Sequence, residues 1–356
     1  KLFDYIGAPD ADRLVILMGS GSGAVRETVK FLNENGQKVG ALIVRLYRPF
    51  SISDFMESIP QSINKIAVLD RTKEPGSIGE PLYMDTVNAY VESDRQMPKI
   101  IGGRYGLSSK EFHPGMVKAV YDELLKETPK NHFTIGINDD VTKLSLEYDQ
   151  HLSLDKETIN CMFYGLGSDG TVSANKNAIK IIGDTTENNV QGYFVYDSKK
   201  AGGMTVSHLR FGKEQIDSTY LITNADFLAC HHFVFLSKYD ITAKAKKKAT
   251  FLLNAPYSPD EVWDKLPKHI QDDIVEKELQ FYVIDATKVA DEANLGKRIN
   301  TVLQTCFFAI SGVLPKDEAI QKIKDGIVKS YSHKGDDIVK MNFDAVDTSL
   351  ANLHKV

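Results

Sequence analysis

The stretch Ile159-Asn160-Cys161-Met162-Phe163-Tyr164-Gly165-Leu166-Gly167-Ser168-Asp169-Gly170-Thr171 decides the fold class of this chain. A run of β character leads into a Gly-x-Gly-x-x-Gly loop, and helical periodicity extends from Thr171 to Ile182. This order predicts an α/β domain in which loop amides and the start of a helix face a phosphate. The alternative is that the glycines only make a tight turn between strand and helix.

Residues that follow the loop extend the predicted site. In dinucleotide-binding units an acidic residue at the end of the next strand binds ribose hydroxyls, and Asp197 follows a strand predicted at 192–196. Lys199 and Lys200, with two glycines directly after them, are expected in the same crevice. This composition favours a ligand that carries more phosphate than NAD does.

Segments of β and helical character alternate along most of the chain, which predicts two parallel-sheet α/β domains, the second Rossmann-like with a helical tail. Strands are predicted at 14–18, 39–44, 66–69, 100–101, 159–164, 192–196, 227–230, 250–253 and 281–284. Helices are predicted near 22–35, 51–58, 80–93 and 109–126, with Ser108 and Ser109 as N-caps of the fourth, and a helix-rich tail is predicted from 298 to 353. The polar segment 127–132 contains Pro129, so we expect domains at 1–128 and 133–356.

Composition excludes several classes of protein. The 356 residues are 42% hydrophobic and 26% charged, with a mean hydropathy of -0.25 and a net charge of -5. These values disfavour general disorder and a nucleic-acid partner. No apolar run approaches the roughly 18 residues that a membrane-spanning helix needs. Because the first residue is Lys1 and not methionine, we expect the chain to be part of a longer protein.

Cysteine spacing indicates a reducing compartment. Cys161, Cys230 and Cys306 stand roughly seventy or more positions apart. This spacing offers no CxxC pair and no disulfide framework, so we expect neither an iron–sulfur cluster nor a structural zinc site from this chain alone.

Three further motifs have a structural interpretation beside a functional one. The glycines of Gly19–Gly23 are expected to form a turn that opens a helix, because the segment lacks the lysine of a P-loop. The charged segment Asp70–Gly76 is interpreted equally well as a functional loop or a solvated turn. Cys230-His231-His232 is expected in the core or a loop, because neighbouring strand residues point to opposite sides and cannot easily share a metal.

Several stretches together resemble the central part of pyruvate:ferredoxin (flavodoxin) oxidoreductase. The resemblance covers nearly the whole chain, with long motifs in the family's order. It implies that residues up to about 127 form a domain like the C-terminal domain of transketolase and that the remainder forms the family's gamma domain. The stretches are 2–10, 45–50, 68–76, 136–142, 165–176 and 196–210.

The resemblance implies that this chain contacts coenzyme A (CoA) in an enzyme that converts pyruvate and CoA to acetyl-CoA and carbon dioxide. Thiamine diphosphate, magnesium and [4Fe–4S] clusters are expected only in other domains of the parent enzyme, so the chain alone is expected to be inactive, without catalytic residues or metal ligands. Ferredoxin or flavodoxin is the expected partner of a cytoplasmic or, in a eukaryote, organellar parent, expected to be a homodimer. The expected CoA contacts are Gly165, Gly167, Ser168, Asp169, Gly170, Asn175, Lys176, Asp197, Lys199 and Lys200.

Three other interpretations stay open at this point. The same core resembles that of a pyruvate:NADP oxidoreductase fusion. A free-standing NAD-dependent dehydrogenase is motivated only by the glycine loop and Asp197, and a saturable change in NADH fluorescence would distinguish it. A docking module without a ligand would have a closed or empty crevice at 165–203.

Overall fold

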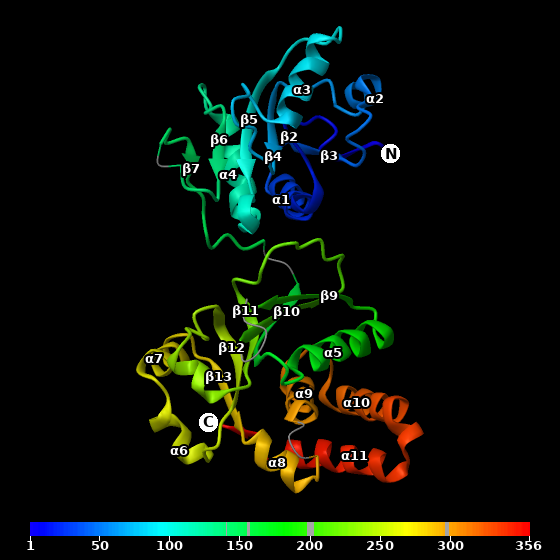
Figure 1. The fold of residues 1–356 in the computed structure, drawn as a ribbon, viewed down its shortest axis with the longest axis vertical. Helices are drawn as coiled ribbons and strands as arrows, with labels where there is room; N and C mark the ends of the chain where they lie inside the picture. Colours follow the sequence, from blue (N-terminus) through cyan, green and yellow to red (C-terminus); the bar gives the residue numbers. More distant parts are fainter. Residues whose placement is uncertain (140, 155–156, 198–202, 296–298) are drawn as a thin grey trace. The chain divides into compact units, whose positions relative to one another are not determined.

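The computed structural model describes residues 1–139, 141–154, 157–197, 203–295 and 299–356. The chain divides into two compact units, the first formed by Lys1–Lys156 with Asp217–Leu221 and the second by Glu157–Ile216 with Ile222–Val356. Each unit contains one sheet covered by helices, and Figure 1 shows each of these layered arrangements. The predicted α/β class is therefore confirmed.

The first sheet has the strand order β1-β3-β2-β4-β5-β6-β7. Only β1 is antiparallel to its neighbour, and the other strands run parallel. Its central strands are buried on both faces, which explains their continuous apolar runs. The strands are β1 (Phe3–Gly7), β2 (Arg13–Met18), β3 (Val39–Val44), β4 (Lys65–Asp70), β5 (Lys99–Tyr105), β6 (Phe133–Ile135) and β7 (Ser145–Leu146).

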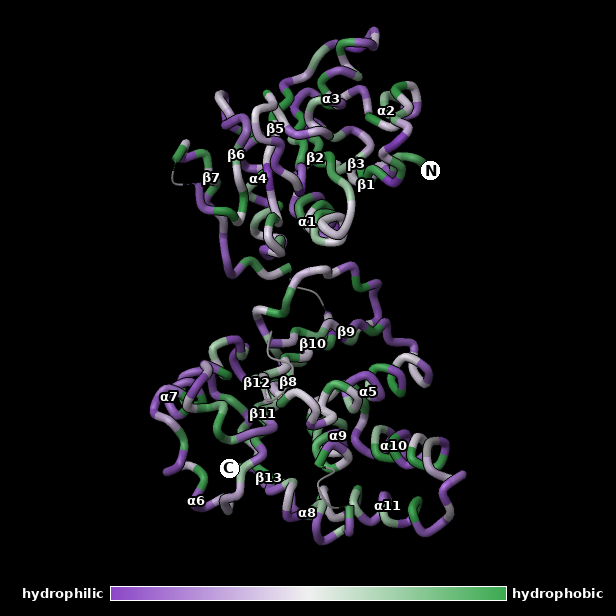
Figure 2. The backbone as a smooth tube through the Cα atoms, in the orientation of Figure 1, coloured by the Kyte–Doolittle hydropathy of each residue, from purple (hydrophilic) through white to green (hydrophobic). Residues whose placement is uncertain are grey.

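Helices cover both faces of this sheet. Val15 and Leu17 of β2 pack with α1 and α4, whereas Leu14 and Ile16 point to the other face and pack with α2 and α3. Figure 2 shows hydrophobic colour along the central strands. The helical segments are η1 (Gly19–Gly21), α1 (Ser22–Glu34), α2 (Ile52–Glu57), α3 (Pro81–Val91), η2 (Leu107–Ser109) and α4 (Pro114–Leu125).

The expected start of α4 at residue 109 was wrong. Ser108 and Ser109 adopt φ values of 55° and 58°, outside the right-handed helical region. The helix instead begins at Pro114, and the His113 side chain accepts the Gly115 amide at 3.2 Å. Proline suits this first helical position because its missing N–H would be unpaired there in any case.

The structural division lies further along the chain than the expected boundary near 128–133. β6 and β7 extend the first sheet, because β6 pairs in parallel with β5 and β7 pairs with β6. Residues 133–146 therefore belong to the first unit, although the polar segment with Pro129 had indicated that the second begins at 133.

A segment from the second half of the sequence also belongs to the first unit. The Glu27 carboxylate of α1 is buried and accepts the Asp217 amide at 3.1 Å, the Ser218 hydroxyl at 2.8 Å and the Tyr220 hydroxyl at 2.8 Å. Close backbone approach is possible because Gly23 has no side chain: an added Cβ would lie 2.0 Å from the Asp217 carbonyl oxygen. We call residues 217–221 the return segment.

The second sheet is mixed, with the order β14-β13-β12-β11-β8-β10-β9. Its centre, β8-β11-β12-β13, is parallel, whereas β10 is antiparallel to both β8 and β9, and β14 is antiparallel to β13. The strands are β8 (Thr158–Leu166), β9 (Asn189–Tyr196), β10 (Met204–Gly212), β11 (Ala225–Cys230), β12 (Ala245–Asn254), β13 (Gln280–Ile284) and β14 (His354–Lys355).

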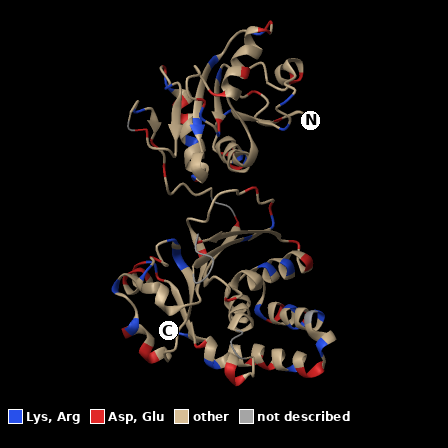
Figure 3. Cartoon of the chain, viewed as in Figure 1, with Lys and Arg blue, Asp and Glu red and all other residues tan. Residues whose placement is uncertain are grey.

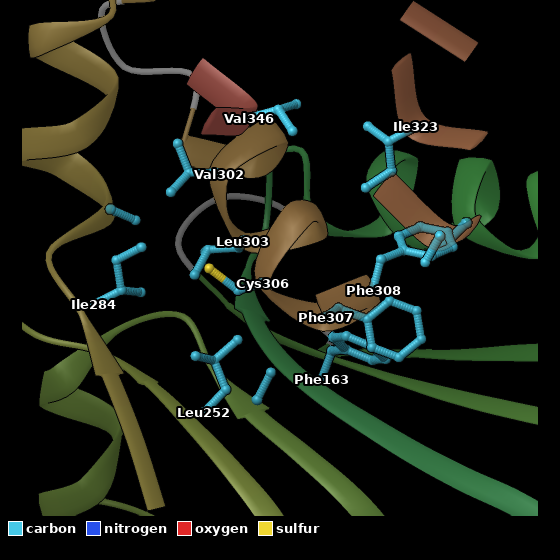
Figure 4. Close-up of a cluster of buried hydrophobic side chains, with 14 of the residues drawn as sticks. Phe163, Leu252, Ile284, Val302, Leu303, Cys306, Phe307, Phe308, Ile323 and Val346 are labelled. Carbon is cyan, nitrogen blue, oxygen red and sulfur yellow. The ribbon is translucent and has the colours of Figure 1, made fainter. Parts of the chain in front are cut away.

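Helices of the second unit also separate onto two faces. α6 (Pro259–Lys265) and α7 (Lys268–Glu276) pack on one face, and α5 (Thr171–Thr185) packs on the other with the helices of the tail. Figure 4 shows Cys306 and Phe307 of α9 directed at the sheet beside Phe163 of β8 and Leu252 of β12. The remaining segments are η3 (Phe233–Ser237), α8 (Ala286–Glu292), α9 (Ile299–Ile310), α10 (Lys316–Tyr331), η4 (Ser332–Lys334) and α11 (Asp336–Ala351).

Charged residues of both signs occur along the outer helices α10 and α11, as Figure 3 shows. Within the described ranges, the helices are too short or too polar to cross a bilayer.

Candidate functional site

The glycine loop lies between β8 and α5, at the carboxyl end of the parallel strands. Gly165 is required by close packing, because an added Cβ would lie 2.5 Å from Thr171 Oγ1. Gly170 has a φ of 86°, and its Cβ position is only 2.3 Å from Asn300 Nδ2. Ser168 adopts a φ of 77°, which is uncommon for a residue with a side chain. The predicted strand, loop and helix are therefore all present.

The Asp169 side chain organises this loop from within. Its carboxylate accepts the Leu166 amide at 2.7 Å, the Thr171 amide at 2.7 Å and His232 Nε2 at 3.0 Å. Burial favours a higher pKa for Asp169, but the hydrogen bonds from His232, Leu166 and Thr171 outweigh burial and lower the pKa to about 2. The carboxylate is therefore ionised at neutral pH.

This carboxylate limits the anion-binding capacity of the loop. The Thr171 amide, at the start of α5, already donates to Asp169, and the Gly167 amide donates to the Gly203 carbonyl at 2.8 Å. The amides of Ser168 and Gly170 donate to no residue that the structure describes. These two amides are the donors that the loop itself offers to a ligand.

Asp197 follows β9, as expected, but β9 is not adjacent to β8 in the sheet. β10 lies between β8 and β9, so Asp197 follows a strand that is two places away from β8. Because neighbouring strands are about 4.8 Å apart, a strand two places away is too distant to match. Asp197 therefore does not occupy the position of the ribose-binding acidic residue in a dinucleotide-binding unit. The Asp197 amide donates to the Met204 carbonyl at 3.1 Å. Lys199 and Lys200 lie outside the described residues.

Asn175 and Lys176 point away from each other on α5. Asn175 is buried on the face that packs against the sheet, and its Nδ2 has no hydrogen-bond partner in the described part of the chain. Lys176 is exposed, and its Nζ lies 5.4 Å from the ring centre of Phe194 in β9. The structure thus gathers Gly165–Gly170 in one loop but places these two residues along the helix.

Two histidines at the end of β11 contact the glycine loop. His231 is buried, with Nδ1 2.7 Å from Thr171 Oγ1, and His232 contacts Asp169 as described. Sequence reasoning treated the pair as core or loop residues and did not connect it with the loop. The position of the two histidines at the end of a strand could have indicated this contact. β11 is parallel to β8 and pairs with it, so both strands end at the same edge of the sheet.

A cavity of about 590 Å³ lies beside these histidines. Residues after β11, β12 and β13 line it, together with one side of α8. The carboxyl edge of the parallel strands therefore holds both the glycine loop and a cavity, which is where ligands bind in open α/β sheets.

Motifs of the first unit serve packing. Gly19–Gly21 form a short turn that opens α1, as expected, and a Cβ on Gly21 would lie 2.7 Å from the Tyr105 hydroxyl. Asp70 is buried and accepts the amides of Leu82 and Tyr83 at the start of α3. Arg71 Nη1 donates to the Ser20 hydroxyl at 2.6 Å. Within the segment 70–76, Asp70 and Arg71 therefore make structural contacts with other parts of the first unit.

The strand, glycine loop and helix at the carboxyl edge of the parallel central strands define the second unit as an α/β domain of the open-sheet type. The chain belongs to the pyruvate ferredoxin/flavodoxin oxidoreductase family, whose profile matches residues 160–351. A second profile, described as pyruvate:ferredoxin oxidoreductase core domain II, matches residues 11–110. The resemblance stated from the sequence is confirmed.

Relatives show that the chain corresponds to one part of longer proteins. It is 56% identical over 369 residues to the pyruvate-flavodoxin oxidoreductase of Nostoc sp. (strain PCC 7120), covering 100% of this chain and 31% of that protein. It is 58% identical over 359 residues to the enzyme of the same name from Trichormus variabilis, covering 100% of this chain and 30% of the relative. A pyruvate dehydrogenase (NADP(+)) from Cryptosporidium parvum is 48% identical over 361 residues, and the chain covers 19% of its length.

Proposed function

We propose that this chain is the CoA-contacting and scaffolding part of a pyruvate oxidoreductase that passes electrons to ferredoxin or flavodoxin. The whole enzyme would convert pyruvate and CoA to acetyl-CoA and carbon dioxide. Thiamine diphosphate with magnesium would supply the decarboxylation chemistry and [4Fe–4S] clusters the electron path, both from other domains. This chain would contribute binding and orientation of CoA, and it would not oxidise pyruvate by itself.

The observation that carries this proposal is that the amides of Ser168 and Gly170 donate a hydrogen bond to no described residue. Two backbone N–H groups in a strained loop at the carboxyl edge of a sheet suit one phosphate oxygen. The Asp169 carboxylate in the same loop opposes an anion, so a phosphate there needs a compensating positive charge. Lys199 and Lys200 follow β9 in the sequence and are the cations that we propose for this role.

A matched pair of glycine variants in the full-length enzyme tests the loop. Gly170→Ala forces the Asn300 side chain away and removes its 2.6 Å hydrogen bond to the Asp169 carbonyl. Gly312→Ala is the control, because Gly312 has a similar φ of 71° but no atom within 4 Å of its Cβ position. We expect Gly170→Ala to raise the KM for CoA about tenfold, as loss of roughly one hydrogen bond implies, and to leave the KM for pyruvate unchanged. Equal effects of the two variants would refute the loop assignment.

The double variant Lys199→Ala/Lys200→Ala tests the proposed cations. Losing a charge-assisted contact to phosphate typically costs about 1.5–3 kcal/mol, and solvent exposure reduces this value. We expect a higher KM for CoA and an unchanged KM for pyruvate. An unchanged dependence on CoA would show that the lysines form a solvated turn.

Activity of the isolated chain tests its role as a part of the enzyme. We expect no pyruvate-dependent reduction of a viologen dye, even with thiamine diphosphate, magnesium and CoA added. Turnover by the isolated chain, free of clusters, would contradict the proposal.

The electron acceptor belongs to the proposal as well. Ferredoxin or flavodoxin is favoured over NADP because the relatives named for flavodoxin reach 56% and 58% identity, compared with 48% for the relative named for NADP. We propose a cytoplasmic homodimer as the working form. Assays of the full-length enzyme with each acceptor decide between the alternatives.

A further inference from the structure

The cavity at the ends of β11, β12 and β13 has a chemical character different from that of the glycine loop. Its lining includes His231 and Asn254, and the apolar residues Phe233 and Pro256. It also includes Lys288, Asp291 and Glu292 of α8. The cavity thus combines apolar lining residues with acidic ones.

His231 can present a hydrogen-bond acceptor. Its Nδ1 lies 2.7 Å from Thr171 Oγ1, and that hydroxyl oxygen can accept the Nδ1–H. In this tautomer Nε2 is the unprotonated nitrogen, and it has no partner in the described part of the chain although the residue is only 4% exposed. Burial also lowers the pKa of His231 to about 4, so the ring is neutral at pH 7.

Carboxylates dominate the charge of the cavity. Lys288 Nζ lies 4.0 Å from Glu292 Oε1, and these two charges largely balance each other. One oxygen of Asp285 accepts the Lys288 amide at 3.0 Å, which leaves its second oxygen available. The Asp291 carboxylate makes no hydrogen bond or ion pair with any described residue. Among the described lining residues, two negative charges therefore remain beside a neutral imidazole.

We propose that this cavity binds an organic cation that carries a guanidinium or ammonium group on a short aliphatic chain. The aliphatic part packs on Phe233 and Pro256, and the cationic N–H groups donate to Asp285, Asp291 and Nε2 of His231. The same carboxylates repel phosphate, so this ligand is distinct from the proposed CoA contact and does not depend on it. The cation can come from a free small molecule or from an arginine side chain of a polypeptide.

Titration of the full chain with agmatine by calorimetry tests the proposal. We expect saturable binding that weakens at least about tenfold in the double variant Asp285→Asn/Asp291→Asn, because two charge-assisted contacts become neutral. Asparagine caps a helix as well as aspartate does, so the variant keeps the start of α8. The control is Asp337→Asn/Asp344→Asn, which removes two exposed carboxylates from α11 and should leave binding unchanged.

The variant Lys288→Gln tests whether the cavity prefers a cation or an anion. Removing this positive charge should strengthen agmatine binding about two- to fivefold, as expected for a partly screened charge. An anion site would respond in the opposite direction. A shift of the His231 Nε2 resonance on agmatine addition should report the predicted hydrogen bond, and wild-type CoA titrations in parallel keep the two proposals separable.

A capped Gly-Arg-Gly peptide distinguishes the two sources of the cation. Stronger binding of agmatine supports a free small molecule, and stronger binding of the peptide supports an arginine side chain. Binding of neither probe, or displacement of agmatine by pyrophosphate in wild type and in the Asp285→Asn/Asp291→Asn variant alike, overturns the proposal.

Discussion

The carboxylate of Asp169 and Nε2 of His232 lie 3.0 Å apart, and they connect the loop after β8 to the end of β11. The same carboxylate accepts the amides of Leu166 and Thr171, on either side of the glycine loop. One side chain therefore sets the shape of the loop and its distance from the neighbouring strand.

Replacing this carboxylate should loosen the loop. In Asp169→Asn one acceptor oxygen becomes an amino group that faces donors, so we expect the amides of Leu166 and Thr171 to exchange with solvent about tenfold faster or more. Hydrogen exchange of the two amides is the measurement. Asp184→Asn, an exposed position near the end of α5, should exchange like the wild type. Unchanged protection in Asp169→Asn would show that the backbone alone holds the loop.

Two glycines in the second unit should respond to alanine in opposite directions. Gly165→Ala places a Cβ 2.5 Å from Thr171 Oγ1, and such overpacking typically costs about 1–3 kcal/mol. Gly326→Ala lies within α10 with its nearest contact at 3.4 Å, so helix propensity should raise the free energy of unfolding by about 0.5–1 kcal/mol. Urea denaturation of both variants gives the signs, and destabilisation by Gly326→Ala would contradict this account of α10.

Acid should destabilise the second unit through buried histidines. Burial, with repulsion from Lys244 and Arg210, lowers the pKa of His208 to about 3. Between pH 6.5 and pH 3 the unfolded chain therefore binds a proton that the folded chain does not, and stability falls as the pH falls. The slope approaches about 1.4 kcal/mol per pH unit for this group.

Substitution of His208 checks the source of this slope. His208→Gln keeps an acceptor for the Ile222 amide, which donates to His208 Nδ1 at 3.2 Å, but it cannot take up a proton. Urea denaturation at pH 7, 6 and 5 should show a shallower loss of stability in this variant. His333→Gln, at an exposed position, should retain the slope of the wild type.

Glu27 should control the return segment. Glu27→Ala removes a shared acceptor of the Asp217 amide and the hydroxyls of Ser218 and Tyr220, so the free energy of unfolding of the first unit should fall by about 2–4 kcal/mol. Exchange of the Asp217 amide should accelerate in parallel. Glu34→Ala removes an exposed carboxylate from the end of the same helix and should change neither quantity. Wild-type exchange in Glu27→Ala would show that other contacts hold the segment.

Strands with continuous apolar runs could be predicted from the sequence, and strands defined by distant partners could not. β10 was missed because its buried face includes Thr205 and Ser207, whose polarity hides the alternation. β7 is two residues long, and only its pairing with β6 makes it a strand. Local pattern therefore predicts strands with a continuous apolar run better than strands that are very short or carry polar residues on their buried face.

The candidate site shows the same division. The glycine loop and its helix were predicted, because strand, glycines and helical periodicity are all local. The contacts of His231 and His232 with Thr171 and Asp169 span 60 and 63 positions in the sequence, and they depend on β11 lying beside β8. Local spacing carries no information about that neighbour.

The return segment also affects the order in which the protein matures during synthesis. Glu27 and its partners are made 190 to 193 residues apart. At about 5–20 residues per second, a ribosome needs about 10 to 40 seconds to cover that interval. During this time β8, β9 and β10 are synthesised, and the return segment that contacts Glu27 on α1 has not yet been made. The earlier-synthesised unit is thus completed only after translation of the later one has begun.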